Sequence, residues 1–220
     1  MKKDQGFTLI EIIVSLGIFT VVAVVAVGAY LKVLDANKKS QTLKTAINNI
    51  NFALESMTRE MRVGSSYYCY ANAADFPIGG VTASSLPSAG HGCASGNGGI
   101  IAFASSKGGL DNPDSGATCR LAYAYAITDY DPANLTATST ITKAEQKYCN
   151  QAITTSDFIP VISPDAIIDA HVLKVIQGVA SGPQAAQPKV FIRLKGHTGV
   201  KEKSKTYFDV QTTISQRNQF

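Results

Sequence analysis

The chain has 220 residues, which allows one membrane-spanning helix and one globular domain of ordinary size. Its net charge of +4 is too small to indicate nucleic-acid binding on its own, and charged residues make up only 16% of the sequence. All four cysteines follow the apolar N-terminal segment, which favours an oxidising, extracytoplasmic location.

The N-terminal apolar segment carries no charged residue from Ile12 to Leu31, about 20 positions, enough to cross a bilayer as a helix. Within it, Ser15 and Thr20 can bond back to carbonyls of their own helix. Glu11 lies near the start of the segment, where a charge in hydrocarbon is costly. The sequence therefore predicts a membrane helix whose one carboxylate needs a partner.

Residues 1–11 carry a recognisable motif, Met-Lys-Lys-Asp-Gln-Gly-Phe-Thr-Leu-Ile-Glu. The motif resembles the leader and cleavage site of type IV pilin-like proteins, a family that includes pilins, minor pilins and the pseudopilins of type II secretion. The resemblance implies a leader of residues 1–6, cut after Gly6 by the membrane-bound prepilin peptidase. It further implies N-methylation of Phe7 and a role for Glu11 in filament assembly.

The spacing of Phe7 and Glu11 supports the same interpretation on physical grounds. A cut after Gly6 frees an ammonium group on Phe7, and positions i and i+4 share one face of a helix. The ammonium and the carboxylate can neutralise each other, within one subunit or between neighbours, in a medium that penalises either charge alone.

Three other interpretations of the N-terminus stay open at this point. Glu11 can be a side chain that snorkels at the membrane interface. The segment can be an ordinary secretory signal cleaved near Val27-Gly28-Ala29, or an uncleaved signal anchor. Lysines flank the apolar segment on both sides, so the positive-inside rule does not decide its orientation.

The helix is expected to continue beyond the membrane, from Thr8 to Arg62, with Gly64 as a plausible C-cap. Residues 7–31 would form the transmembrane or filament-core part and residues 32–63 an amphipathic part. The amphipathic part has one apolar stripe at helical spacing, made of Leu43, Ile47, Ile50, Leu54, Met57 and Met61.

Residues 64–220 are expected to form a β-rich head with disulfide-stapled loops. Residues 65–99 are interpreted as a long irregular segment, residues 128–142 as a loop, and residues 143–151 as a short helix or turn. Pro160 restricts its strand to a sheet edge. Strands are predicted at residues 100–103, 121–127, 158–162, 172–176, 190–195 and 207–214.

The last three predicted strands should form an antiparallel sheet, with the Leu43–Met61 stripe covering one face. The fold class is therefore α+β, a long N-terminal helix packed on an antiparallel sheet, as in the pilin family. Residues 53–62 and 210–218 also resemble minor pilins and J-type minor pseudopilins more than major subunits.

The four cysteines allow three disulfide pairings. Neighbours in sequence are preferred, Cys69 with Cys93 and Cys119 with Cys149, because each bond would staple a loop-rich stretch. A metal site is the rival interpretation, but the sequence has no Cys-x-x-Cys or His-x3–5-His spacing. No metal site is expected, and His91 is interpreted as a loop histidine.

No catalytic constellation is evident, so neither an enzyme activity nor a cofactor is expected. The segment Asp111–Gly116 only superficially suggests a calcium loop, because Pro113 and Ser115 stand where acids or Asn are wanted and no Glu follows at the loop end. Asn134 begins a glycosylation sequon by pattern alone.

A basic segment near the C-terminus is opposed only by Glu202. It suggests either a patch for DNA or an anionic surface, or a solvated hairpin whose lysines blunt an exposed edge. The second interpretation is favoured, because no aromatic platform is apparent among the cations. These cations are Lys189, Arg193, Lys195, Lys201, Lys203 and Lys205.

The sequence therefore predicts a structural subunit, expected to be minor, of a type IV pilus or type II secretion pseudopilus. Its partners would be other subunits, prepilin peptidase and the cytoplasmic membrane, with the head extracytoplasmic; nucleic acid is a less favoured partner. The alternatives are a membrane-anchored binding module that does not polymerise, and a secreted enzyme.

Overall fold

The computed structural model describes residues 6–87, 91–93, 98–112, 115–129, 139–176, 178, 187–199 and 205–217. The chain divides into two compact units, residues 1–44 and residues 45–220, and the second unit is called the head below. Both units contribute to one helix, α1 (Leu9–Val63), which confirms the helix expected over residues 8–62.

In the head, α1 buries one stripe of side chains, and the predicted apolar stripe is confirmed from Ile50 onward. The helix ends at Val63, and the N–H of the following Gly64 donates to the carbonyl of Met61 at 3.0 Å. A Cβ at Gly64 would lie 2.5 Å from the ring of Phe103, so only glycine allows this close approach. The buried residues of the stripe are Ala46, Ile50, Ala53, Leu54, Met57 and Met61.

The first sheet has five antiparallel strands in the order β1-β2-β3-β4-β5. The short β5 lies at an edge and contains Pro160, as expected from the missing N–H of proline. Its strands are β1 (Ser65–Tyr70), β2 (Ile100–Asn112), β3 (Ser115–Thr128), β4 (Thr140–Glu145) and β5 (Ile159–Pro160), with the 3₁₀ turn η1 (Thr155–Asp157) before β5.

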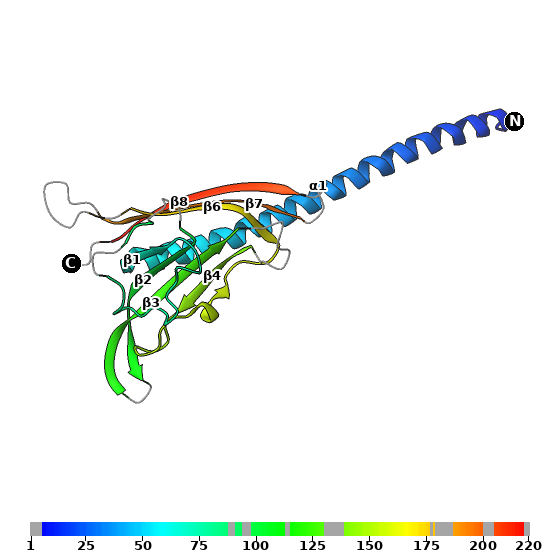
Figure 1. Ribbon diagram of the computed structural model, residues 1–220. Coiled ribbons are helices and arrows are strands. Elements are labelled where there is room, and N and C mark those ends of the chain that lie inside the picture. The colour runs from blue at the N-terminus through cyan, green and yellow to red at the C-terminus, as the bar shows by residue number, and fades with distance from the viewer. Residues whose placement is uncertain are drawn as a thin grey trace. The chain divides into compact units, whose positions relative to one another are not determined.

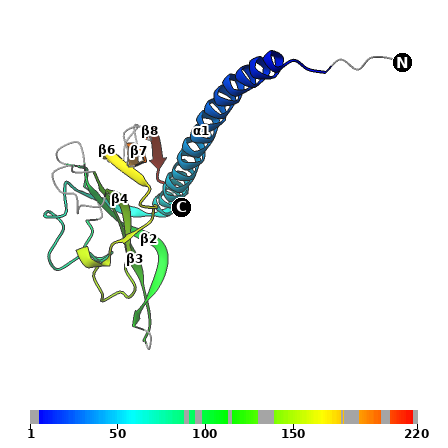
Figure 2. The same ribbon diagram turned by 90° about the vertical axis from the view of Figure 1, so that its right-hand side faces the viewer.

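Three sequence-based assignments in this sheet are wrong in part. The segment 65–99 begins with a strand, β1. Strand β4 takes up the end of the expected loop 128–142 and the start of the expected helix or turn 143–151, in which only residues 149–150 form a turn. The β2–β3 hairpin is also much longer than predicted, and both figures show it extending past the rest of its sheet (Figures 1 and 2). The suspected calcium loop falls in this hairpin, and its Pro113 and Asp114 lie outside the described residues, as does Asn134.

The second sheet is the predicted antiparallel C-terminal one, with strands β6 (Ala166–Ile176), β7 (Lys189–Thr198) and β8 (Thr206–Ser215). The strand order is β6-β7-β8, so β7 is central. The alternation predicted for β7 is confirmed, because Val190, Ile192 and Leu194 are buried. The register pairs β7 with β8 residue for residue over ten positions, from Lys189–Ser215 to Thr198–Thr206.

The main core of the head joins α1 to both sheets. Figure 1 shows the head part of α1 running between the three-stranded sheet and the five-stranded sheet. Phe103 and Tyr123 of the first sheet, and Leu173 and Ile192 of the second, belong to the same buried cluster as Met57. A second, smaller cluster covers the other face of the five-stranded sheet, where alanines of β2 and β3 pack under loop residues such as Phe76 and Val81.

Candidate functional site

The start of α1 is organised by Thr8 and Glu11. The Thr8 side-chain oxygen accepts a hydrogen bond from the Glu11 N–H at 3.4 Å, and the Glu11 carboxylate accepts one from the Thr8 N–H at 2.9 Å. The Thr8 hydroxyl also donates to that carboxylate at 2.7 Å. This reciprocal pattern is a capping box, which satisfies backbone N–H groups that the first turn of a helix leaves without partners.

Gly6 and Phe7 precede this cap in non-helical conformation, and both are exposed. A Cβ built on Gly6 would meet nothing within 4 Å, so the Gly6–Phe7 peptide is accessible from the side. With this peptide intact, the Phe7 nitrogen is an amide rather than an ammonium, and the Glu11 carboxylate bonds to Thr8 instead.

Sequence reasoning had treated Thr8 only as part of the motif and missed its capping contact. The signal was present, because Thr-x-x-Glu before an apolar run is the pattern of a capping box. Glu11 thus has two candidate partners, Thr8 in the uncut chain and the Phe7 amine after a cut.

The following turns of α1 expose almost exclusively apolar side chains. Leu16 is 64% exposed and Phe19 69% exposed, and none of the most apolar 18-residue stretch is buried within the protein. Ser15 and Thr20 donate to the carbonyls of Ile12 and Leu16 at 3.0 and 2.8 Å, so their hydroxyls are satisfied within the helix, as expected. The helix is long and apolar enough to cross a membrane.

The head contains two disulfides, Cys69–Cys93 and Cys119–Cys149, which is the pairing preferred from the sequence. Gly98 packs directly against the first of them, because a Cβ there would collide with the sulfurs of both cysteines. The second disulfide ties β3 to the loop after β4.

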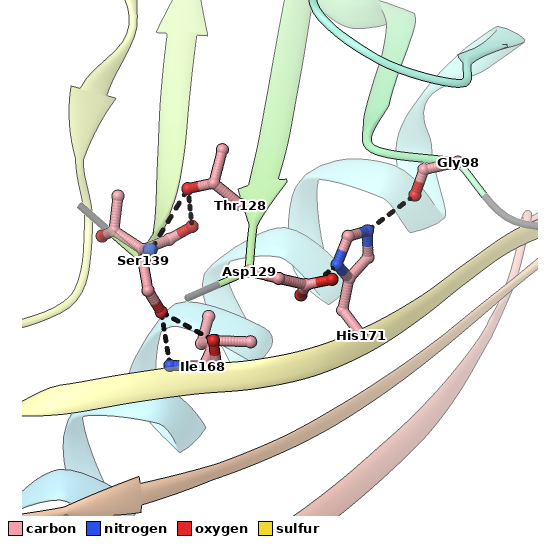
Figure 3. Close-up of polar contacts among 7 residues, drawn as sticks. Gly98, Thr128, Asp129, Ser139, Ile168 and His171 are labelled. Carbon is pink, nitrogen blue, oxygen red and sulfur yellow. Dashed lines mark hydrogen bonds and ion pairs between the residues drawn. The ribbon is translucent and has the colours of Figure 1, made fainter. Parts of the chain in front are cut away.

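A seam of polar contacts joins the free edge of β6 to the five-stranded sheet (Figure 3). Ser139 bonds to the backbone of Ile168, while the His171 ring lies between Asp129 and Gly98. His171 Nδ1 is 2.5 Å from Asp129 Oδ1, and its Nε2 is 3.0 Å from the Gly98 carbonyl oxygen. Both ring nitrogens face acceptors, so only the imidazolium form can donate to both.

The structure does not place the β7 part of the basic segment at an exposed sheet edge, as the favoured interpretation expected. Lys189, Arg193 and Lys195 are on β7, which is the central strand of its sheet, so they cannot blunt an exposed edge. Phe191 lies between Lys189 and Arg193 on the same face of β7, so an aromatic side chain does lie among the cations. Lys201 and Lys203 lie outside the described residues.

The remaining histidines and acids form no metal cluster: within the described ranges, no group of three or more potential ligands comes together. His91 stacks on Tyr68, with ring centroids 4.8 Å apart, and its backbone pairs with Tyr67 and Cys69. Its observed contacts therefore hold the loop before Cys93 against β1.

Comparison with known protein families gives one match, to the prokaryotic N-terminal methylation motif over residues 1–27. Searches of the curated proteins and of the solved structures gave no match. Proteins with this motif are pilin-type structural proteins, typically non-enzymatic, that are processed by prepilin peptidase and assemble as subunits. Residues 1–27 carry the type IV prepilin signature, and the chain as a whole has the α+β architecture of a pilin-like protein.

Proposed function

We propose that this protein is a minor subunit of a type IV pilus or of a type II secretion pseudopilus. In this proposal prepilin peptidase removes residues 1–6, Phe7 becomes the N-methylated terminus, and residues 7–31 enter the filament core. Residues 32–63 then carry the helix into the head, residues 64–220, on the extracytoplasmic side of the membrane. The observation that carries the proposal is the match of residues 1–27, because it combines the cleavage motif with an apolar helix.

The contacts at the start of α1 give the proposal a mechanism. Cleavage after Gly6 converts the Phe7 amide nitrogen into an ammonium four residues before Glu11. In hydrocarbon an isolated carboxylate costs about 2.5–3.5 kcal/mol at a helix centre, and less near the helix end. Pairing with an ammonium, of the same chain or of the next subunit, removes much of that cost. Glu11 would thereby favour the axial offset between neighbouring subunits that brings the Phe7 terminus of one helix next to Glu11 of another.

The two disulfides support an extracytoplasmic head, because such bonds persist in oxidising compartments. The minor role is supported by the resemblance of residues 53–62 and 210–218 to minor subunits.

The decisive experiment is the mass of the N-terminal peptide, measured on protein from native membranes and from sheared surface material. The proposal expects a peptide that begins at Phe7 with one added methyl group. An intact Met1 would indicate an uncleaved anchor, and a start near Tyr30 would indicate a secreted domain; either would overturn the proposal.

A second experiment tests the assembly step separately. Glu11→Ala should leave the protein inserted and processed but reduce its recovery in filaments, or reduce secretion where the filament serves secretion. Glu55→Ala is a matched control, because Glu55 is an exposed carboxylate on the same helix that forms an exposed salt bridge with Arg59. Equal assembly of the Glu11→Ala and Glu55→Ala proteins would contradict the role of Glu11.

The second candidate function is a membrane-anchored binding module that does not polymerise. The cations of β7, which share one solvent-facing surface, favour it. It predicts a processed protein that stays in the membrane fraction whether or not Glu11 is present.

A further inference from the structure

The solvent-facing side of the three-stranded sheet gathers cations from two strands. Since Val190, Ile192 and Leu194 are buried, the alternate residues of β7 point outward. The register places Lys174 of β6 directly opposite Phe191. Five residues of this side are called the basic face below: Lys174, Lys189, Phe191, Arg193 and Lys195. Two apolar residues of β6, Val172 and Ile176, lie on the same side, opposite Arg193 and Lys189.

The charges of the basic face are only partly neutralised. Arg193 donates to both carboxylate oxygens of Asp209, at 2.9 and 2.6 Å, and Lys195 lies 3.8 Å from the same carboxylate. This pairing lowers the pKa of Asp209, chiefly through the hydrogen bonds from Arg193. No ion pair among the described residues involves Lys174 or Lys189, and both are exposed. Four cations thus face one carboxylate.

Among the residues that the structure describes, other charges near the basic face do not cancel it. Asp169, at the irregularity in β6, is 2.8 Å from His197 Nδ1, and the His197 side chain is only 6% exposed. Gln211, Thr213 and Ser215 of β8 lie opposite Arg193, Phe191 and Lys189 and add neutral hydrogen-bonding groups. Lys174 and Lys189, which have no ion pair within the described part of the chain, therefore lie on either side of a corner that Phe191 occupies: Lys189 two residues before it on β7, and Lys174 opposite it on β6.

An aromatic side chain occupies the middle of this cationic surface. Phe191 is half-buried, lies between Lys189 and Arg193 along β7, and has Lys174 and Thr213 on either side. Tyr207, 68% exposed, lies at the far end of the same side of the sheet, with its ring centroid 5.8 Å from that of His197. Cations that track phosphates, combined with rings on which bases stack, are the features of single-strand-binding sheets.

We propose that the basic face binds single-stranded nucleic acid, with Lys174 and Lys189 on the phosphates and Phe191 stacked on a base. A duplex fits less well, because an aromatic ring on a sheet can stack only on a base that is already unpaired. This inference goes beyond the proposed function and does not depend on filament assembly, since binding is measured on the isolated chain.

The test uses the full chain in detergent micelles and a fluorescein-labelled oligothymidylate of about 16 nucleotides, near the upper site size of a single-strand-binding fold. Fluorescence anisotropy at several salt concentrations gives both the affinity and its salt dependence. The double variant Lys174→Gln/Lys189→Gln should bind more weakly, and the slope of log K against log salt should fall by about 1.4, which corresponds to two phosphate contacts. The control is Lys44→Gln/Lys147→Gln, which removes the same charge from exposed positions elsewhere.

The aromatic contact is tested independently of charge. Phe191→Leu should weaken binding about tenfold without changing the salt slope, and Phe191→Tyr should retain most of the affinity. Circular dichroism checks that each variant is folded.

Two results would overturn the proposal. One is equal weakening by both lysine pairs, which would mean that only the overall charge matters. The other is a combined result, in which Phe191→Leu binds oligothymidylate as tightly as the unchanged protein and dextran sulfate, a polyanion without bases, fully displaces the oligothymidylate.

Discussion

The side-chain hydroxyl of Ser139 bonds to both backbone groups of Ile168. It donates to the Ile168 carbonyl at 2.8 Å and accepts from the Ile168 N–H at 2.5 Å, across 29 residues of sequence. Ile168 lies on the edge strand β6, so a single hydroxyl occupies the positions that a neighbouring strand would take (Figure 3). Ser139 is buried, so water cannot easily replace it.

Ser139→Ala should therefore lower the free energy of unfolding by about 1–3 kcal/mol, because two buried backbone groups lose their partner. The measurement is urea unfolding of the full chain in detergent, followed by tyrosine near-ultraviolet circular dichroism, since the chain has no tryptophan. Ser40→Ala, on an exposed part of α1, is the matched control. A change no larger than that of the control, within about 0.5 kcal/mol, would show that the bridge is not stabilising.

A second prediction concerns the ion pair between α1 and β4. Glu60 Oε1 is 2.6 Å from Lys143 Nζ, the side chains are 17% and 19% exposed, and Tyr125 donates to the other Glu60 oxygen at 2.6 Å. Glu60→Leu leaves the ammonium of Lys143 and the Tyr125 hydroxyl without their main acceptor. The substitution should lower the free energy of unfolding by about 2–3 kcal/mol. This value is at the lower end of the range for removing one partner of a buried ion pair, because some water reaches these side chains.

The same pair provides its own control. The double variant Glu60→Leu/Lys143→Met removes both charges and should regain at least about 1 kcal/mol relative to Glu60→Leu alone. Glu55→Ala should change stability by less than about 0.5 kcal/mol, because the Glu55–Arg59 pair is exposed. Strictly additive effects of the two substitutions at Glu60 and Lys143 would contradict a direct coupling.

A third prediction concerns alkaline pH. Burial raises the pKa of Tyr70 to about 12 and raises the pKa values of Tyr67, Tyr123 and Tyr125 further, and hydrogen bonds to Glu145 and Glu60 add to the shift of the last two. The folded state therefore keeps protons that the unfolded chain loses near pH 10. This contribution is fully present below about pH 10 and is lost as the pH rises through the folded pKa values, by up to about 1.4 kcal/mol per pH unit for each tyrosine.

Urea unfolding at a series of alkaline pH values, with tyrosinate absorbance in parallel, measures this loss. Tyr125→Phe should reduce the steepness of the decline by about one proton. A stability that stays constant to about pH 11 would contradict burial of these hydroxyls.

The sequence predicted the parts of the fold that depend on local pattern. The strict alternation in β7 and β8 predicted their burial, and the 3–4 spacing from Ile50 to Met61 predicted the buried face of α1. Strand β4 was missed because Lys143, Ala144 and Glu145 favour helix; pairing with Tyr123 to Tyr125 of β3 overrides that preference. Strand β1 was missed because its two serines follow a helix end, and because a segment rich in small residues follows Tyr70.

Contacts across the sheets were beyond sequence reasoning. Nothing in the sequence links Ser139 to Ile168, or Glu60 to Lys143, because these pairs depend on how two sheets and a helix pack together. The basic segment illustrates the same limit: its residues were visible, but the central position of β7 and the shared face of Phe191 required the strand order. The Thr8–Glu11 cap, by contrast, is local and could have been predicted.

The last prediction concerns that cap. Thr8→Val keeps the shape of the side chain but removes the oxygen that bonds to the Glu11 N–H and the hydroxyl that bonds to the Glu11 carboxylate. In the uncut protein, the first turn of α1 should lose about 1 kcal/mol of stability, the typical value of an N-cap. This loss corresponds to about fivefold faster amide exchange at Glu11 and Ile12, whose N–H groups bond to Thr8. Thr8→Ser should retain the cap. Thr20→Val should leave exchange at the first turn unchanged, because the Thr20 hydroxyl donates to the carbonyl of Leu16 and not to the first turn.

Hydrogen exchange in detergent micelles, before and after cleavage by prepilin peptidase, measures the effect. After cleavage the Phe7 ammonium offers Glu11 a second partner, so the difference in exchange rate between Thr8→Val and the unchanged chain should be smaller than before cleavage. An equal difference before and after cleavage would show that Glu11 does not exchange Thr8 for the new terminus.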